Sequence, residues 1–198
     1  MDAAMPAPVV GSRRSAKPYM EDAMLAIIGC GNPNRQDDGF GSAVIAQLKK
    51  LDAQEHWAGV ALLDAGCEGP AVMLAARGAS ALIVVDANKS GSEPGTIYKV
   101  PGNEMAHAHE TGFCVHDFRW DHVLHVARKL LKADGPDDVL VLLVEEDKFG
   151  LGSELTPCVA AAVESVVARI VERIEASRAS EPVSKVDAQR FGRKPAVQ

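Results

Sequence analysis

Residues 29–41 read Gly-Cys-Gly-Asn-Pro-Asn-Arg-Gln-Asp-Asp-Gly-Phe-Gly, and this glycine-rich stretch decides the fold. It follows a short apolar run at residues 24–28 and precedes a helical pattern, which is typical of a loop between a buried strand and a helix. Glycine permits the close backbone approach that such a loop needs. The adjacent acids Asp37 and Asp38 then fall at the carboxyl end of the strand, where open α/β sheets keep their binding sites.

Strand and helix patterns alternate through the rest of the chain. This alternation predicts the α/β class, with a single three-layer domain whose mostly parallel, twisted sheet of about five strands has helices on both faces. Apolar runs predict strands at residues 24–29, 60–63, 81–85, 96–100 (an edge strand) and 139–144. Helical spacing predicts helices at residues 39–51, from Pro70, at 117–132 and at 157–177, the last with Thr156 as its N-cap.

Composition and charge limit the classes of protein to which this chain can belong. The chain has 198 residues, of which 47% are hydrophobic and 24% charged, as in one soluble globular domain. We expect a disordered extension at residues 1–22, the folded domain at 23–177 and a flexible tail at 178–198. The net charge is −6, but residues 1–20 carry +2 and residues 178–198 carry +3, so the middle is strongly acidic. An acidic middle disfavours nucleic acid as a partner.

The four cysteines are widely spaced and form no CxxC pair, which disfavours a disulfide framework. No apolar run approaches the roughly 20 residues that span a bilayer, and the N-terminal stretch has no apolar core typical of a secretory signal. We therefore expect a cytoplasmic protein without a membrane partner, and a monomer.

The sequence disfavours three other kinds of site: a dinucleotide-binding loop, a serine nucleophile and a cysteine nucleophile. A dinucleotide loop would need glycine where Asn34 stands, and the two carboxylates would repel a phosphate. No G-x-S-x-G elbow is present, so Ser42 is interpreted as a surface or packing residue. Cys30 is expected to pack at the strand end, whereas Cys67 and Cys114 stay open as weak candidate nucleophiles.

A metal site fits the acidic residues better. Asp38 follows the first predicted strand, Asp64 ends the second and Asp86 ends the third, so their carboxylates can converge at one edge of a parallel sheet. Crowded like charges are costly unless a cation or proton compensates. His116, ahead of a predicted helix, could add a nitrogen ligand. Each Asp taken alone is more commonly a helix cap or turn residue.

Four further histidines are expected to be solvated. His107 and His109 lie in a predicted loop, and His122 and His125 lie three apart on a predicted helix, where they could in principle clasp a metal. The segment Glu145-Glu146-Asp147 is more acidic than a simple connecting loop requires.

These motifs together resemble the hydrogenase maturation proteases over about residues 24–175. The resemblance rests on their order along the chain: G-x-G-N…D-D-G-x-G at residues 29–41, Leu-Asp-Ala-Gly at 63–66, Val-Asp-Ala at 85–87, Pro-Gly-Thr at 94–96, His116, and Leu-Gly…Leu-Thr-Pro at 151–157. Members of this family are endopeptidases that remove a C-terminal extension from the large-subunit precursor of nickel–iron hydrogenases after nickel insertion.

The resemblance implies roles for particular residues. Asp38, Asp86 and His116 match the family's metal-binding trio, with Asp38 in place of the Glu of some members. They would recognise nickel carried by the substrate, and other divalent ions could substitute. Asp38, Asp86 and Asp64 are the implied catalytic residues, with Asp64 as a general acid–base or substrate-orienting group. His116 is preferred over His122 as the ligand, from the register of the helix that follows.

Two questions stay open from the sequence. The metal could polarise the scissile carbonyl or activate water, or it could only identify the substrate. The chain could also be a non-catalytic, metal-dependent binding protein or chaperone for an immature metalloenzyme, or a nucleotide-binding module.

Overall fold

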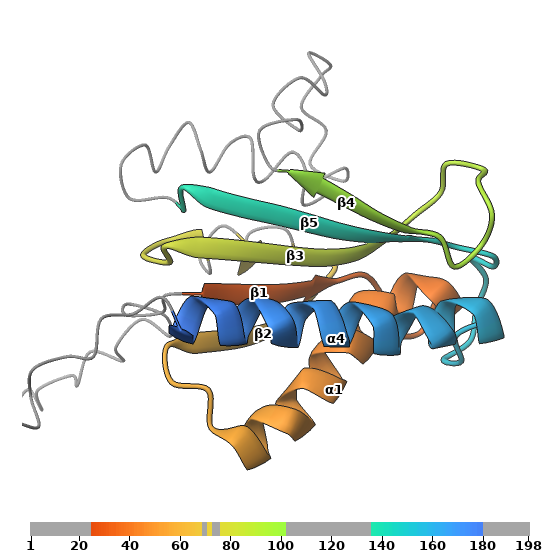
Figure 1. Cartoon of the computed structure of the whole chain (residues 1–198). Coiled ribbons are helices and arrows are strands. Elements are labelled where there is room, and N and C mark those ends of the chain that lie inside the picture. The colour runs from red at the N-terminus through yellow and green to blue at the C-terminus, as the bar shows by residue number, and fades with distance from the viewer. Residues whose placement is uncertain (1–24, 69–70, 73–75, 102–135, 180–198) are drawn as a thin grey trace, which may run out of the picture.

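A five-stranded sheet with the strand order β2-β1-β3-β5-β4 forms the centre of the computed structural model (Figure 1). The structure describes residues 25–68, 71–72, 76–101 and 136–179. The strands are β1 (Leu25–Cys30), β2 (Val60–Gly66), β3 (Ala81–Asn88), β4 (Ile97–Pro101) and β5 (Asp138–Glu145). Strands β2, β1, β3 and β5 pair in parallel, and β4 pairs antiparallel with β5 at the edge. The predicted fold class is confirmed.

Two long helices, α1 (Phe40–Glu55) and α4 (Pro157–Ala179), cover one face of the sheet (Figure 1). They share one core cluster with the inward-facing residues of β1, β3 and β5, such as Ile27, Val85 and Val144. Alternate residues of the same strands, such as Ile28 and Val84, belong to a second cluster on the opposite face. All six residues of β1 are buried, which explains why its sequence is apolar without alternation.

The second face gathers the helical residue Val72 together with Ala76 and Ala79. Val72 and Ala76 fall in the helix predicted from Pro70, and both are buried. The helix predicted at 117–132, the loop predicted before it and the extension at 1–22 lie outside the described residues. None of the described helices is long and apolar enough to cross a membrane.

Observed boundaries differ from the predicted ones where pairing decides them. Strands β2 and β3 continue to Gly66 and Asn88, so Asp64 and Asp86 lie inside the paired segments rather than at their ends. Helix α4 continues to Ala179, two residues beyond the predicted helix end at residue 177. Of the predicted tail, residues 178–179 are helical, and the rest lies outside the described residues.

The strand order places a topological switch between β1 and β3. The chain leaves β1 toward β2 on one side and later returns to β3 on the other side of β1. Crevices in open parallel sheets form outside the carboxyl ends of the strands at such a switch. The loop after β1 and the carboxyl end of β3 therefore flank the expected site.

Glycines hold the first helix against the first strand. A Cβ on Gly41 would lie 2.2 Å from the Cys30 carbonyl oxygen and 2.6 Å from that of Val85, so no other residue fits without moving backbone. Gly29 faces the same contact, because its Cβ would lie 2.3 Å from the Gly41 carbonyl oxygen. Gly29 and Gly41 thus permit close packing of α1 on β1.

We expect Gly41→Ala to lower the free energy of unfolding by about 3 kcal/mol, because backbone atoms rather than flexible side chains must shift. Gly91→Ala is the matched comparison, since Gly91 has open space around it but a φ of +84°. It should cost only about 1 kcal/mol. Urea denaturation of both variants measures the difference, and equal losses would contradict this account of Gly41.

Candidate active site at the carboxyl edge of the sheet

A short 3-10 turn, η1 (Gln36–Gly39), carries both adjacent acids into the site region. Gln36 precedes them with a φ of +51°, a left-handed conformation that costs a non-glycine residue roughly 1–2 kcal/mol. Gly31 is also left-handed, with a φ of +107°, and a Cβ there would lie 1.8 Å from the Asp38 carbonyl oxygen. The turn is therefore wrapped tightly around Gly31.

Asp37 is fully buried and supports the loop that follows β5. Its carboxylate accepts hydrogen bonds from the backbone N–H groups of Asp147 (3.0 Å), Lys148 (2.9 Å) and Thr156 (2.7 Å). The Thr156 hydroxyl donates to both carboxylate oxygens, at 3.0 and 2.9 Å. Burial alone would raise the pKa of Asp37, but these hydrogen bonds hold the pKa below its ordinary value. Asp37 therefore joins the loop after β1 to the loop after β5.

The same contacts revise the account of Thr156. It occupies the predicted N-cap position, since α4 begins at Pro157 and the Thr156 carbonyl accepts the first helical hydrogen bond from Ala160. Its hydroxyl, however, donates to Asp37. Thr156 therefore joins the start of α4 to the loop after β1.

Asp38 turns away from this buried network. Its side chain is half-buried, and its Oδ2 accepts a hydrogen bond of 3.1 Å from the backbone N–H of Asn32. The two adjacent acids thus have separate environments, because one is sealed inside the loop contacts and the other lies at the partly open edge.

Asp64 is exposed and held from two sides. Its Oδ1 accepts hydrogen bonds from the hydroxyl of Ser42 (2.9 Å) and from the backbone N–H of Gly66 (3.2 Å). Ser42 lies on α1 and is buried, so the expectation that it is a simple surface or packing residue was incomplete. It orients a carboxylate of the site.

Asp86 lies near the end of β3 with 9% of its surface exposed. Its Oδ1 accepts a hydrogen bond of 2.8 Å from the backbone N–H of Ala87. Because β1 and β3 are adjacent and parallel, Asp86 lies across the switch point from the turn that carries Asp38.

The charges of the three carboxylates act on two nearby thiols. Desolvation raises the pKa of Cys67, and the charges of Asp38 and Asp86 raise it further, while Arg35 opposes them. Burial raises the pKa of Cys30 more strongly, with Asp86 and Asp64 adding to the shift. Both thiols are therefore kept protonated, which disfavours either as a nucleophile. Cys114 lies outside the described residues.

Glu145, at the end of β5, anchors the loop that follows Asp86. This carboxylate is 1% exposed and accepts backbone N–H hydrogen bonds from Ser90 (2.7 Å), Gly91 (2.6 Å) and Ser92 (3.2 Å). The Ser90 hydroxyl also donates to it, at 2.8 Å. Burial opposes ionisation, but these hydrogen bonds lower the pKa of Glu145.

Each residue from Glu145, the last of β5, to Asp147 therefore makes a contact that stabilises the structure. Glu145 binds the loop after β3, Glu146 forms an ion pair of 3.0 Å with Lys89, and the Asp147 N–H binds Asp37. Glu145 and Ser42 were missed as contributors to the site by sequence reasoning. A run of small residues at 90–92, whose backbone N–H groups suit an anion, is the signal that could have indicated Glu145.

The proposed metal ligands are only partly described. Asp38 and Asp86 lie on either side of the switch point. His116 and His122, like the other histidines between residues 107 and 125, fall outside the described residues. Within the described ranges, no three His, Cys, Asp or Glu side chains form a group that could hold a metal ion. The carboxylates present can supply oxygen ligands, act as general acid–base groups, or attract a cationic substrate group.

The sequence matches the family model for the hydrogenase maturation protease over residues 44–173, more than half of the chain. The chain belongs to the hydrogenase maturation protease family. A family member from Methanocaldococcus jannaschii is 30% identical over 159 residues, covering 76% of this chain and 99% of its own. The coenzyme F420 hydrogenase subunit delta of Methanothermobacter thermautotrophicus is 29% identical over 167 residues, covering 81% of this chain and 99% of its own.

Solved structures agree on the fold of this protease. The hydrogenase maturating endopeptidase HybD from E. coli has a TM-score of 0.64 at 20% identity, covering 77% of this chain and 93% of its own. The maturation protease HycI from Thermococcus kodakarensis KOD1 has a TM-score of 0.60 at 20% identity, covering 80% and 96%. With the family match, the protein is an endopeptidase, a hydrolase that acts on peptide bonds.

The lowered pKa of Glu145 predicts a pH-dependent contribution to stability. Because the folded pKa lies below the unfolded value of about 4.3, the carboxylate stabilises the fold fully above that pH. The contribution is lost as pH falls through the lower, folded pKa. We expect Glu145→Gln to lose about 1–2 kcal/mol near neutral pH and to lose less further stability than wild type on acidification.

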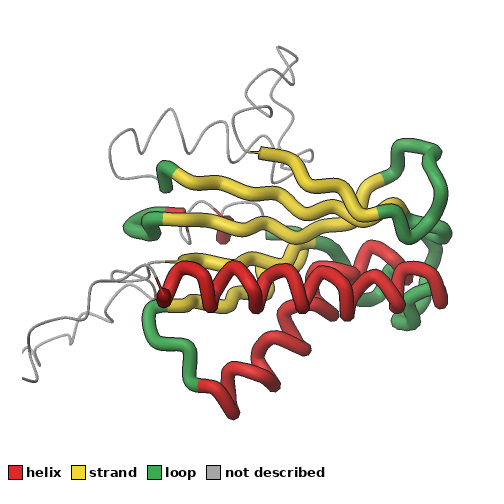
Figure 2. Tube along the Cα trace, viewed as in Figure 1, coloured by secondary structure: helices red, strands yellow, loops and turns green. Residues whose placement is uncertain are grey.

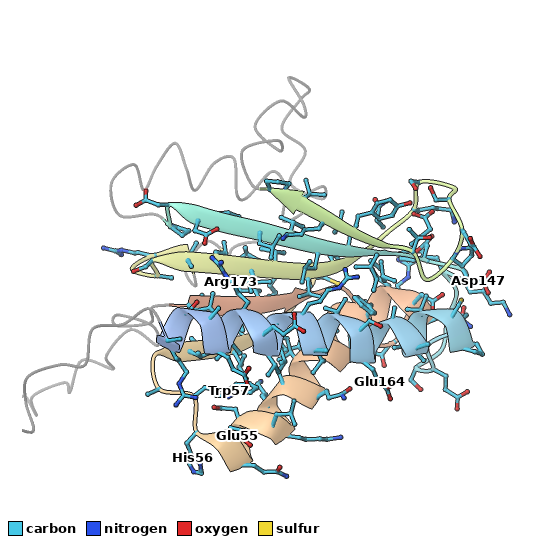
Figure 3. The ribbon with its side chains drawn as sticks, in the orientation of Figure 1. Glu55, His56, Trp57, Asp147, Glu164 and Arg173 are labelled. Carbon is cyan, nitrogen blue, oxygen red and sulfur yellow. The ribbon has the colours of Figure 1, made fainter. Side chains whose placement is uncertain are left out.

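Urea denaturation at several pH values tests this expectation. Glu164→Gln is the control, because Glu164 lies exposed on α4 and its substitution removes the same charge (Figure 3). A Glu145→Gln variant that parallels wild type across the acid range would contradict the role given to this carboxylate.

Proposed function

We propose that this protease removes the C-terminal extension of a nickel–iron hydrogenase large-subunit precursor after nickel insertion, and that it recognises the nickel carried by that precursor. Membership of the hydrogenase maturation protease family supports the processing reaction and the large-subunit precursor as partner. The parallel pairing of β1 with β3 brings the loop that carries Asp38 and the end of β3 that carries Asp86 to one edge of the sheet, and this is the observation that supports a metal-facing edge.

The chemistry of the edge suits a metal held mainly by the substrate. Two carboxylates and one imidazole leave coordination positions for the precursor's own ligands, and borderline divalent ions such as Ni²⁺ accept oxygen and nitrogen donors. Asp38, Asp86 and His116 are the proposed ligands. Few fixed ligands on the enzyme favour a precursor that brings its metal, since an empty precursor offers no bridge between the two proteins.

Asp64 is the proposed general acid–base or substrate-orienting group, and Asp38 and Asp86 would also act on the reacting peptide. The hydroxyl of Ser42 and the backbone N–H of Gly66 both donate to Oδ1 of Asp64, so the Asp64 carboxylate has a fixed orientation. A fixed carboxylate can accept or return a proton at a defined position. The acidic middle of the chain disfavours nucleic acid as a partner, and the scattered cysteines suit the reducing cytoplasm. A cytoplasmic monomer without a membrane partner completes the proposal.

A second function uses the same edge without cleavage. The protein could hold an immature metalloenzyme through Asp38 and Asp86 as a metal-dependent chaperone. Its family membership favours the endopeptidase. The two functions differ in one product, because only the endopeptidase shortens the precursor.

We expect Asp38→Ala and His116→Ala each to abolish shortening of the nickel-loaded precursor, because each removes a proposed metal ligand. Intact-mass measurement of the precursor before and after mixing with the protein checks this. The exposed Glu164→Gln variant should cleave like wild type. Full cleavage by both Ala variants would remove these residues from the mechanism, and a wild-type protein that binds the precursor without shortening it would favour the chaperone.

A further inference from the structure

Two large apolar side chains are exposed among the residues that the structure describes, and both lie on the loop after β5. Phe149 is 42% exposed and Leu151 is 92% exposed. Single exposed apolar residues are ordinary on protein surfaces. Here both lie in one short segment, between the Lys148 N–H that binds Asp37 and the start of α4. Figure 3 shows Asp147, at the start of this segment, at the opposite end of the molecule from His56.

Hydrogen bonds to the loop after β1 keep these side chains outward. The backbone N–H of Gly150 donates to Oε1 of Gln36 (3.0 Å), and the Gln36 N–H donates to the Gly152 carbonyl (2.7 Å). The Gly152 N–H donates in turn to the Asn34 carbonyl (3.0 Å). Leu151 lies between Gly150 and Gly152, and these hydrogen bonds fix both glycines. The same hydrogen bonds therefore determine that the Leu151 side chain is exposed.

Gln36, which makes two of these hydrogen bonds, has a strained backbone conformation. Its φ of +51° is in the left-handed region, and its side chain and backbone both bind the loop after β5. Strain of this kind persists where surrounding contacts impose it, and it concentrates at functional sites. The strained residue directly precedes Asp37 and Asp38.

Arg35 adds a cation to the same surface. Its guanidinium carbon lies 4.1 Å from the centroid of the Phe149 ring, so the two groups stack. A stacked guanidinium uses its face and keeps its N–H donors in its own plane, where they can bind carbonyl oxygens. The backbone N–H of Asp38 donates a hydrogen bond of 3.3 Å to the Arg35 carbonyl, which places this surface beside the Asp38 carboxylate.

We propose that Arg35, Phe149 and Leu151 form a docking surface for the C-terminal segment of the precursor next to the scissile bond, with Leu151 and Phe149 contacting an apolar side chain and Arg35 a backbone carbonyl. This proposal rests on the proposed function, because the same site must receive a peptide. The surface is named the 35/149/151 surface.

The size and position of the 35/149/151 surface favour a short peptide as its occupant. A stable interface between folded proteins buries about 800 Å² on each partner, far more than two apolar side chains supply. A short extended segment needs only a few such contacts. The loops around the switch point lie at one end of the fold (Figure 2), and the Asp38 N–H bonds to the Arg35 carbonyl, so a segment held there is in the same region as Asp38.

Leu151→Ser tests the proposal with the nickel-loaded large-subunit precursor as substrate. We expect KM for cleavage to rise about tenfold, which corresponds to about 1.4 kcal/mol of lost binding, with little change in kcat. Leu151→Met should restore a KM close to wild type, because it retains the apolar surface. The urea midpoint of Leu151→Ser should match wild type, since the side chain is almost fully exposed.

Glu154→Ser is the neighbouring control, because Glu154 is also exposed on this loop but adds no apolar surface. A Leu151→Ser protein with wild-type KM, measured beside an active wild type, would overturn the docking surface and leave the proposed function intact. A wild type that never shortens the precursor would overturn both. Self-association that disappears in Leu151→Ser while KM stays unchanged would instead assign the surface to a second copy of the chain and overturn the proposal.

Discussion

The buried carboxylate of Asp37 is the contact on which the site depends. A charge withdrawn from water is costly unless hydrogen bonds replace its hydration, and here N–H and hydroxyl groups from 110 to 119 residues later in the chain replace it. The turn that holds Asp37 and the loop that surrounds it therefore stabilise each other. Asp38, the next residue, takes its position from this long-range contact rather than from its own hydrogen bond to Asn32 alone.

The parallel sheet accounts for the concentration of negative charge at one edge. It brings the carboxyl ends of β1, β2 and β3 side by side, and Asp38, Asp64 and Asp86 come with them. Backbone N–H groups and the Ser42 hydroxyl stabilise these acids individually. Their charges add to the effect of burial in raising the pKa of the Cys30 and Cys67 thiols. An edge with this charge attracts cationic groups, and Arg35 stacks on Phe149 next to it in the loop after β1.

Much of the fold could be predicted because its signals are local. The uninterrupted apolar run of β1 and the helical spacing in α1 and α4 depend on residues close in sequence, and all three elements are present, although α1 and α4 continue to Glu55 and Ala179, beyond their predicted ends. Strand ends were less accurate, since β2 and β3 continue past Asp64 and Asp86 only because β1 and β5 remain beside them to pair. Ser42 was misjudged for a similar reason, because its partner Asp64 lies 22 residues away on another strand.

The sequence by itself determined the α/β class, the family and the positions of three acids near strand ends, because periodicity and motif order are properties of neighbouring residues. Only the tertiary structure decided how the two adjacent acids divide their roles. Nothing local distinguishes Asp37 from Asp38, and the difference arises when the segment from Glu145 to Thr156 folds back over one of them. The same folding fixed Glu145 beneath the loop after β3 and left Leu151 exposed, because hydrogen bonds across 55 and 114 residues set those positions.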